Sequence, residues 1–398
     1  MGKGGTALKP RRFAVAPDVL IWARQSARLS TAEAARRIGV AEPRVGQWES
    51  GEVEPTINQL RHAAEAYSRP LAALFLPAPL TEEAVFDLPD FRRPEAEGEE
   101  SAPLRRAILR AKNQQEALQD IQDELGDVAI PSLSSIDIDH MDAEHAGHQL
   151  REDLGFVDLP PRLWSQPEEL LRELVRRVED RGYLVIQVQR VPVSEMRGFS
   201  IAAELAPLIA INGADWPRGK VFTLLHELAH LGLRRSGLCD LSRQSSVAEE
   251  RFCDQVAAAA LMPSRSFRSA VKTLAIDPTS YNDLRVLSDK FGSSAEAGLI
   301  RMIHLGLASW EDYSVLRTEF RSAYDRHKQD EKDARIGKDA PIYYQLKVRD
   351  LGRPFIASLI RAHNEGALSS RDTARLLDVS YDKIPKLIER VASAEVLA

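Results

Sequence analysis

Apolar residues recur three and four positions apart along most of the chain, which is the period of an α-helix. One region has a different pattern, which is typical of β-strands. The runs 183–188, 198–202 and 207–212 are rich in β-branched and apolar residues and are bounded by Gly, Pro and Asn. We therefore predict a mainly α, multidomain protein in which these runs form one small antiparallel sheet inside an α+β domain.

Four short helical patterns open the chain within 13–79. Segments 17–28, 32–38, 41–50 and 55–67 each carry an apolar stripe, and Gly39 stands between the second and the third. A short helix with a Ser or Thr cap, a Gly stop and a following helix is typical of a helix-turn-helix unit. We expect an all-α domain at 13–79.

The next part of the chain, 80–158, is expected to hold a linker and amphipathic helices. Residues 78–103 are rich in Pro and Glu and lack periodicity, as in a solvated linker. One long amphipathic helix follows, serving as a spacer, a homodimer contact or a surface helix of the next domain. Its apolar positions are Leu104, Ile108, Ala111, Leu118, Ile121 and Leu125.

The main domain is expected at 159–326 and a helical C-terminal domain at 327–398. Within the latter, 369–387 shows a capped short helix, a Val-Ser turn and a second helix, which resembles another helix-turn-helix. Pro385 lies inside the second helix, however, and an internal proline breaks a helix. We therefore favour a protein-binding tail over a second helix-turn-helix.

Composition and charge place the protein among ordinary globular chains. Its 398 residues suffice for two or three domains, with 44% hydrophobic and 28% charged residues. The two cysteines cannot form a disulfide framework, and neither a secretory h-region nor an 18-residue apolar run is present, so we expect a cytoplasmic protein without a membrane partner. Net charge is −6, yet residues 1–62 hold ten Lys and Arg against six Asp and Glu. A basic head on an acidic body favours DNA binding.

The strongest chemical signal is His226-Glu227-Leu228-Ala229-His230. On a helix, two histidines four residues apart lie on one face, so both imidazoles can reach one metal ion. Glu227 lies about 100° around the helix from His226, beside the ion, where a carboxylate can take a proton from a water.

A catalytic zinc ion usually takes a third protein ligand. The segment 250–263 reads as a second helix ended by Pro263, with a capping-box spacing between Ser246 and Glu249. Glu250 fits the third position, and its neighbour Glu249 is not excluded by spacing alone.

These residues together resemble the ImmA/IrrE metallopeptidase family. The resemblance runs through Ile211-Asn212, the 221–230 stretch, Glu250 with Cys253-Asp254, and the Ala-rich run to Met262-Pro263. It implies a zincin-like endopeptidase with metal ligands His226, His230 and Glu250 and Glu227 as general acid and base. Well-known members cleave helix-turn-helix repressors, and an exposed sheet edge would bind the substrate as an added strand.

The N-terminal segment 29–55 resembles the Cro/C1 (XRE-type) repressor domain. That resemblance implies base contacts from Glu42, Pro43, Arg44 and Gln47, with Thr31 near a phosphate. The second helix lacks the Gln usual there, and the recognition helix carries Pro43 and Gly46. We expect DNA binding, with reuse of the module for protein contacts as the alternative.

The leading hypothesis is thus an intracellular metal-dependent endopeptidase with a DNA-binding head. Its protein substrate would be a repressor or neighbouring gene product in a stress, prophage or toxin–antitoxin circuit. The alternative is a transcriptional regulator or antitoxin whose peptidase domain is a sensor or scaffold. One divalent ion is expected; zinc is the default, although such a site also accepts manganese or iron.

Overall fold

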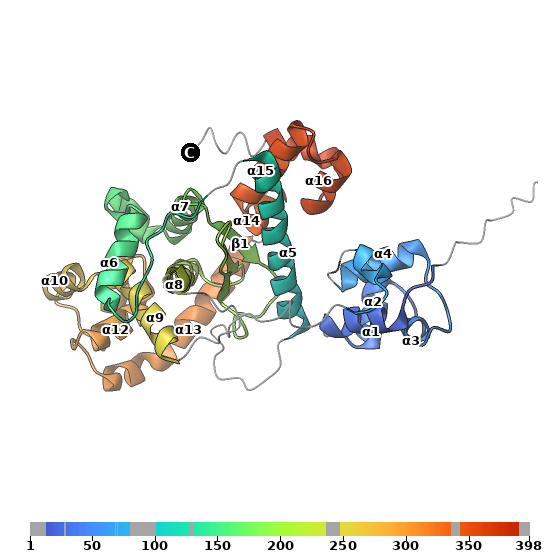
Figure 1. Cartoon of the computed structure of the whole chain (residues 1–398). Coiled ribbons are helices and arrows are strands. Elements are labelled where there is room, and N and C mark those ends of the chain that lie inside the picture. Colours follow the sequence, from blue (N-terminus) through green and yellow to red (C-terminus); the bar gives the residue numbers. More distant parts are fainter. Residues whose placement is uncertain are drawn as a thin grey trace, which may run out of the picture. The chain divides into compact units, whose positions relative to one another are not determined.

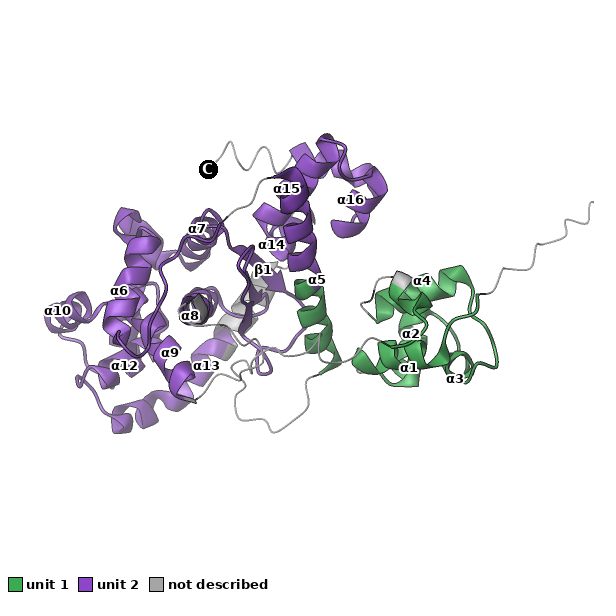
Figure 2. Ribbon diagram, in the orientation of Figure 1, with its two compact units in different colours: residues 1–87, 95–112 green, residues 88–94, 113–398 purple. Residues whose placement is uncertain are grey.

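The computed structural model describes residues 13–27, 29–67, 69, 71–79, 101–126, 130–235, 247–335 and 343–389. The chain divides into two compact units, residues 1–87 with 95–112 and residues 88–94 with 113–398 (Figure 2). The first unit is entirely helical where it is described. The second combines many helices with one three-stranded sheet, so the protein is mainly α, as expected.

The first unit is built from four helices, a short 3-10 helix and the start of α5. Their bounds are α1 Pro17–Ser26, α2 Thr31–Ile38, α3 Glu42–Glu49, α4 Ile57–Ala66, η1 Leu71–Phe75 and α5 Ala102–Leu125. Ser30 and Glu33 form the capping box of α2, and Gly39 ends it with a φ of 79° in the left-handed region. Val45 and Trp48 of α3 are buried, and α3 packs on α2. The helix-turn-helix arrangement is confirmed.

The second unit contains the rest of α5 and the elements that follow. In chain order these are α6 Ala143–Asp153, η3 Phe156–Asp158, η4 Pro161–Ser165, α7 Pro167–Glu179, β1 Leu184–Val188, β2 Gly198–Ile201, β3 Leu208–Asn212, α8 Pro217–Arg235, α9 Val247–Leu261, α10 Ser264–Leu274, α11 Tyr281–Asp289, α12 Ala295–His304, α13 Trp310–Arg335, α14 Tyr343–Leu351, α15 Arg353–Asn364, α16 Ser370–Leu376 and η5 Tyr381–Lys383.

The sheet has the order β1-β3-β2 and is mixed rather than antiparallel. β2 and β3 run antiparallel, with Gly198 opposite Ile211, whereas β1 and β3 run parallel, with Leu184 opposite Leu208. The expectation of a wholly antiparallel sheet is therefore wrong for β1. β3 therefore lies in the middle of the sheet, and β1 and β2, which follow each other in the chain, lie at its two edges.

Helix α8 is the central element of the second unit. It packs against β2 and β3 on one side and against α7 and α9 on the others (Figure 1). Its residues 220–232 are almost all buried, which explains why the apolar stripe around the histidines is so broad. A helix enclosed in this way holds its side chains in fixed positions.

Helix α9 is locked to α6 by a very close approach at Gly147. A β-carbon built on Gly147 would lie 2.6 Å from the Cβ of Ala259 and 2.8 Å from the backbone nitrogen of Ala260. The run of small residues Ala257–Ala260 thus lets α6 and α9 meet almost backbone to backbone. Residues of α6 belong to the same apolar core as α8 and α9.

Replacing Gly147 by valine should lower the free energy of unfolding by about 3 kcal/mol or more, because the clash involves backbone and overpacking of a core alone costs about 1–3 kcal/mol. Urea unfolding followed by circular dichroism measures the change. His148→Val, at the exposed next position, controls for helix propensity and should cost well under half as much. Equal losses in both variants would show that the α6–α9 contact is not tight.

The outer edge of β1 is covered by the C-terminal helices. Leu184 donates its backbone N–H to Pro207, so the alternate residue Val185 directs its backbone groups away from β3. There the Val185 amide donates to the carboxylate of Glu179, and Gly352 lies against the Val185 carbonyl. Gly352 has a φ of 79°, and a β-carbon there would lie 2.8 Å from that oxygen. Only glycine fits this junction of α14 and α15.

Glu179 is one of the few buried acids, and two backbone amides hold it. Burial raises the pKa of Glu179 to about 8, although Arg353 beside it acts in the opposite direction. Besides Val185, the Arg353 amide donates to Glu179 over 3.1 Å. These bonds join α7, β1 and the start of α15 at one point.

Among the described residues, none of the helices has both the length and the apolar character that a bilayer crossing requires.

Candidate metal centre

Helix α8 presents His226 and His230 on one face, one turn apart. Both imidazoles are buried, with 1% and 8% of their surface exposed. Their Nε2 atoms lie 3.0 Å from each other. Leu224, Leu225 and Leu228 on the same stretch of helix are buried as well, so the histidine pair lies in the interior of the unit.

Helix α9 brings Glu250 to the same point. Its Oε2 lies 3.3 Å from His226 Nε2, and its Oε1 lies 3.3 Å from His230 Nε2. In the described part of the chain, these three residues form the one group of His, Cys, Asp and Glu side chains arranged to hold a metal ion. Glu249, which the spacing left open, is not among them. The cap expected at Ser246 lies outside the described residues.

The spacing of these donor atoms fits a small divalent cation. Zinc binds nitrogen and oxygen at about 2.0–2.1 Å with tetrahedral geometry, which sets its ligand atoms about 3.3 Å apart. The three observed separations are 3.0, 3.3 and 3.3 Å. Three protein ligands also leave one position of a tetrahedron for a water or substrate, as in catalytic sites.

Asp254 lies within ion-pair distance of one of the histidines. Its Oδ1 lies 3.0 Å from His226 Nδ1, the ring nitrogen that faces away from the other donors. A carboxylate on that nitrogen fixes the tautomer and makes Nε2 a better ligand. Sequence reasoning gave Asp254 no role, although its position four residues after Glu250 places both on one face of α9.

Asp254→Ala should weaken metal binding about 10- to 100-fold, the usual effect of removing such a partner. Competition with a coloured chelator measures the affinity of the purified protein. Arg251→Ala, on the same helix outside this contact, is the matched control. An affinity unchanged in Asp254→Ala would show that the carboxylate does not support His226.

Glu227 occupies a buried position between α8 and β2. The Ser200 hydroxyl donates to Glu227 Oε2 over 2.9 Å, and Glu227 is 2% exposed. Gly198 lies against the same carboxylate, since a β-carbon there would be 3.2 Å from its Oε1 and 2.3 Å from Thr223. The small residues of β2 therefore allow the strand to approach the helix closely. Sequence reasoning did not identify Ser200.

Electrostatics of the site favour the charged form of the Glu250 carboxylate. Burial alone would raise the pKa of Glu250, but the hydrogen bonds from His226 and His230 outweigh it and hold the pKa below its ordinary value. Cys253, one turn further, is fully buried, and burial raises the pKa of its thiol. It is an inert core residue.

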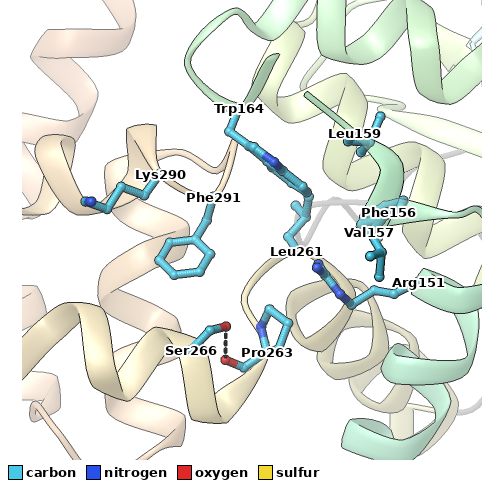
Figure 3. Close-up of a pocket in the computed structure, with 10 residues that line it drawn as sticks. All are labelled: Arg151, Phe156, Val157, Leu159, Trp164, Leu261, Pro263, Ser266, Lys290 and Phe291. Atoms are coloured by element: carbon cyan, nitrogen blue, oxygen red, sulfur yellow. Dashed lines mark hydrogen bonds between the residues drawn. The ribbon is translucent and has the colours of Figure 1, made fainter. Parts of the chain in front are cut away.

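A separate cavity of about 280 Å³ lies at the C-terminal end of α9 (Figure 3). Arg151 and Trp164 point into it, and its lining includes none of the three grouped residues. The Arg151 guanidinium donates to the Ala260 carbonyl and lies 5.0 Å from the centre of the Phe156 ring. Arg151 thereby caps the last turn of the helix that carries Glu250.

The residues expected to contact DNA lie on α2 and α3 of the first unit. Thr31 is the first residue of α2, next to the Ser30 cap. On α3, Glu42 and Pro43 are exposed, whereas Arg44 and Gln47 are half-buried. All five can be reached from solvent, while Val45 and Trp48 on the other side of α3 are buried.

Each of the two units contains a segment that matches a known protein family. Residues 181–302 match a peptidase M78 model described as IrrE N-terminal-like domain, and residues 20–74 match a model described as Helix-turn-helix. Searches among curated proteins and among solved structures gave no match. The M78 segment spans β1 to α12 and includes the three grouped residues. The resemblances to ImmA/IrrE and XRE proteins are thus confirmed, and the chain carries a metallopeptidase-family domain and a DNA-binding fold.

Proposed function

We propose that this chain, which carries an IrrE N-terminal-like peptidase domain and a helix-turn-helix domain, is a zinc-type endopeptidase that acts on a protein linked to its DNA site. The observation that carries the proposal is the convergence of His226, His230 and Glu250, with Glu227 buried beside them. The donor set is two imidazoles and one carboxylate, for which zinc is the default and manganese or iron is an acceptable ion.

The chain's own residues then divide the chemistry of peptide hydrolysis. A divalent ion held there would supply Lewis acidity to the scissile carbonyl and to a water. Glu227 accepts the proton of the attacking water and returns it to the leaving amine. Ser200 fixes Oε2 of Glu227 and leaves the other carboxylate oxygen for proton transfer.

The substrate is proposed to bind along β2 as an added strand. Asn212 donates its N–H to Arg197, so residues 197, 199 and 201 face β3 and the backbone groups of Gly198 and Ser200 face the other way. Gly198 and Ser200 are buried, so an extended peptide would first have to gain access to these groups and would then pair with them as an added strand. Because Ser200 also contacts Glu227, a peptide in that position would pass next to the base.

The fused domains support the proposed substrate class. A helix-turn-helix on the same chain would hold the peptidase near an operator, where the available proteins are repressors and the products of neighbouring genes. Incubating the purified chain with those proteins, with and without a metal chelator, tests the proposal. Chelator-sensitive cleavage of one of them is the expected result. Metal and DNA binding without cleavage of any of them would favour a regulator whose peptidase domain is a sensor.

The N-terminal domain should bind duplex DNA through phosphate contacts that weaken steeply with salt. Each neutralised phosphate contributes about 0.9 to the slope of log affinity against log salt. Arg44→Ala should therefore reduce that slope by about one, whereas Arg61→Ala on α4 should not. Fluorescence anisotropy with a labelled duplex across a salt series measures both. Salt-independent binding would indicate a module used for protein contacts.

A further inference from the structure

Helices α15 and α16 and the helical residues 381–389 repeat the first three helices of the chain at a constant shift of 339 residues. Residue 23 corresponds to 362, and residue 20 to 359, where both pairs are buried Ala and Leu. The buried positions Ala34, Ile38, Val45 and Trp48 of α2 and α3 fall on Thr373, Leu377, Ile384 and Leu387, which are all buried.

The turn between the second and third helices is also the same. In the first unit, Gly39 adopts a φ of 79°, and Val40 donates its N–H to Ala35 over 3.0 Å. In the C-terminal region, the corresponding residue Asp378 adopts a φ of 52°. Val379 donates to Ala374, again over 3.0 Å.

The helix caps agree as well. The Ser30 hydroxyl accepts from the Glu33 amide over 3.2 Å, and the Ser369 hydroxyl accepts from the Asp372 amide over 3.2 Å. The correspondence therefore extends over capping, turn and core, and the two triads of helices share one fold.

Pro385, the reason why the sequence favours a protein-binding tail, is compatible with this fold. Residues 381–383 form a 3-10 turn, and residues 384–389 continue as α-helix. Proline at 385 cannot donate to the carbonyl of residue 381 and would clash with it in an α-helix. The tighter 3-10 turn avoids that clash, so the helix begins before the proline.

The same shift carries the expected DNA-contact positions of the first domain onto positions that are exposed or half-buried. They become Ser370, Tyr381, Asp382, Lys383 and Lys386. Tyr381 is 66% exposed and Lys386 is exposed. Arg375, on the outer side of α16, is exposed as well. The Ser370 hydroxyl on α16, and the phenol and ammonium groups of Tyr381, Lys383 and Lys386 on the third helix, are hydrogen-bond donors for which duplex DNA offers acceptors.

We propose that residues 353–389 are a second DNA-binding helix-turn-helix, with 381–389 as the helix that enters the major groove. Lys383 and Lys386 contact phosphates or base edges, and Tyr381 lies at the groove. The model described as Helix-turn-helix matches only 20–74, so the comparisons do not assign this role. The chain then holds two DNA-binding units. Binding of the N-terminal unit to DNA raises the local concentration of DNA at the C-terminal unit.

The test uses the full chain and a labelled mixed-sequence duplex across a salt series. Lys383→Ala with Lys386→Ala should reduce the salt slope by about two, since each lost phosphate contact removes about 0.9. Affinity at low salt should fall about tenfold, in line with losing contacts of this kind. The control is Arg317→Ala with Arg321→Ala on α13, which removes the same charge from another exposed surface. Thermal unfolding verifies that both variants remain folded.

Two outcomes overturn the proposal. If the Lys383 and Lys386 variant has the affinity and slope of the control variant, the C-terminal unit does not bind DNA and serves protein contacts. If the unaltered chain does not bind the duplex, the proposal also fails. Arg44→Ala in the first domain, measured beside them, separates failure of the N-terminal domain from failure of this unit.

A second experiment measures the DNA sequence preference of the chain. Selection from a randomised duplex library with the full chain should enrich two separate sequence blocks. Tyr381→Ala, which leaves charge unchanged, should lose one block and keep the other. Enrichment of one block that is identical for both proteins would contradict a second reading helix.

Discussion

The Glu227→Gln variant is expected to keep its metal and to hydrolyse peptide bonds about 10²- to 10⁴-fold more slowly, the usual contribution of a positioned general base. Glutamine has nearly the same shape and still accepts a hydrogen bond from Ser200, so β2 and α8 need not move. It cannot accept a proton at neutral pH. Metal content per chain and the rate of cleavage of the neighbouring protein are measured on the same preparation.

The matched control for this variant is Glu249→Gln, which removes a carboxylate from α9 outside the metal group. It should leave both metal content and rate unchanged. A Glu227→Gln protein that cleaves at the original rate would remove Glu227 from the mechanism, whereas a loss of metal in the same variant would show a structural role.

Glu250→Ala is expected to abolish stable metal binding, because only two imidazoles would remain. Since an ion that binds only the folded state stabilises it by about 2.7 kcal/mol at a free concentration 100 times its Kd, the original chain should gain thermal stability when metal is added. The variant should show almost no such gain. Metal analysis and thermal unfolding with and without added zinc measure the two effects.

Glu249→Ala provides the comparison, since the sequence alone could not separate these neighbours. It should keep the ion and the stabilisation. If instead Glu249→Ala loses the ion and Glu250→Ala retains it, the helix is turned relative to the arrangement described for α9, and the third ligand is misassigned.

The sequence predicts those parts of the fold that are determined by residues close to one another in the chain. The capping box at Ser30, the spacing of His226 and His230, and the broad apolar surface of α8 follow from residues a few positions apart. Glu250 became distinct from Glu249 because the geometry of α9 directs only one of them at the imidazoles. Ser200 is distant in sequence from Glu227, and nothing near either residue indicates their contact.

Strand order could not be predicted for a similar reason. Each strand shows a β-rich run, but whether β1 pairs with β2 or β3 depends on how the intervening chain crosses the sheet. Pro385 shows a different limit of local rules. Proline disrupts the interior of an α-helix, but the helix that contains Pro385 begins with a 3-10 turn, which accommodates the proline.

The coverage of the β1 edge also limits aggregation of the protein. Exposed strand edges nucleate aggregates, and a sheet with two open edges can grow in both directions. With Glu179 and Gly352 closing the β1 side, no further strand can pair there, so any growth of the sheet is confined to one direction. A chain cut before α14 would uncover the closed side, and its solubility should fall accordingly.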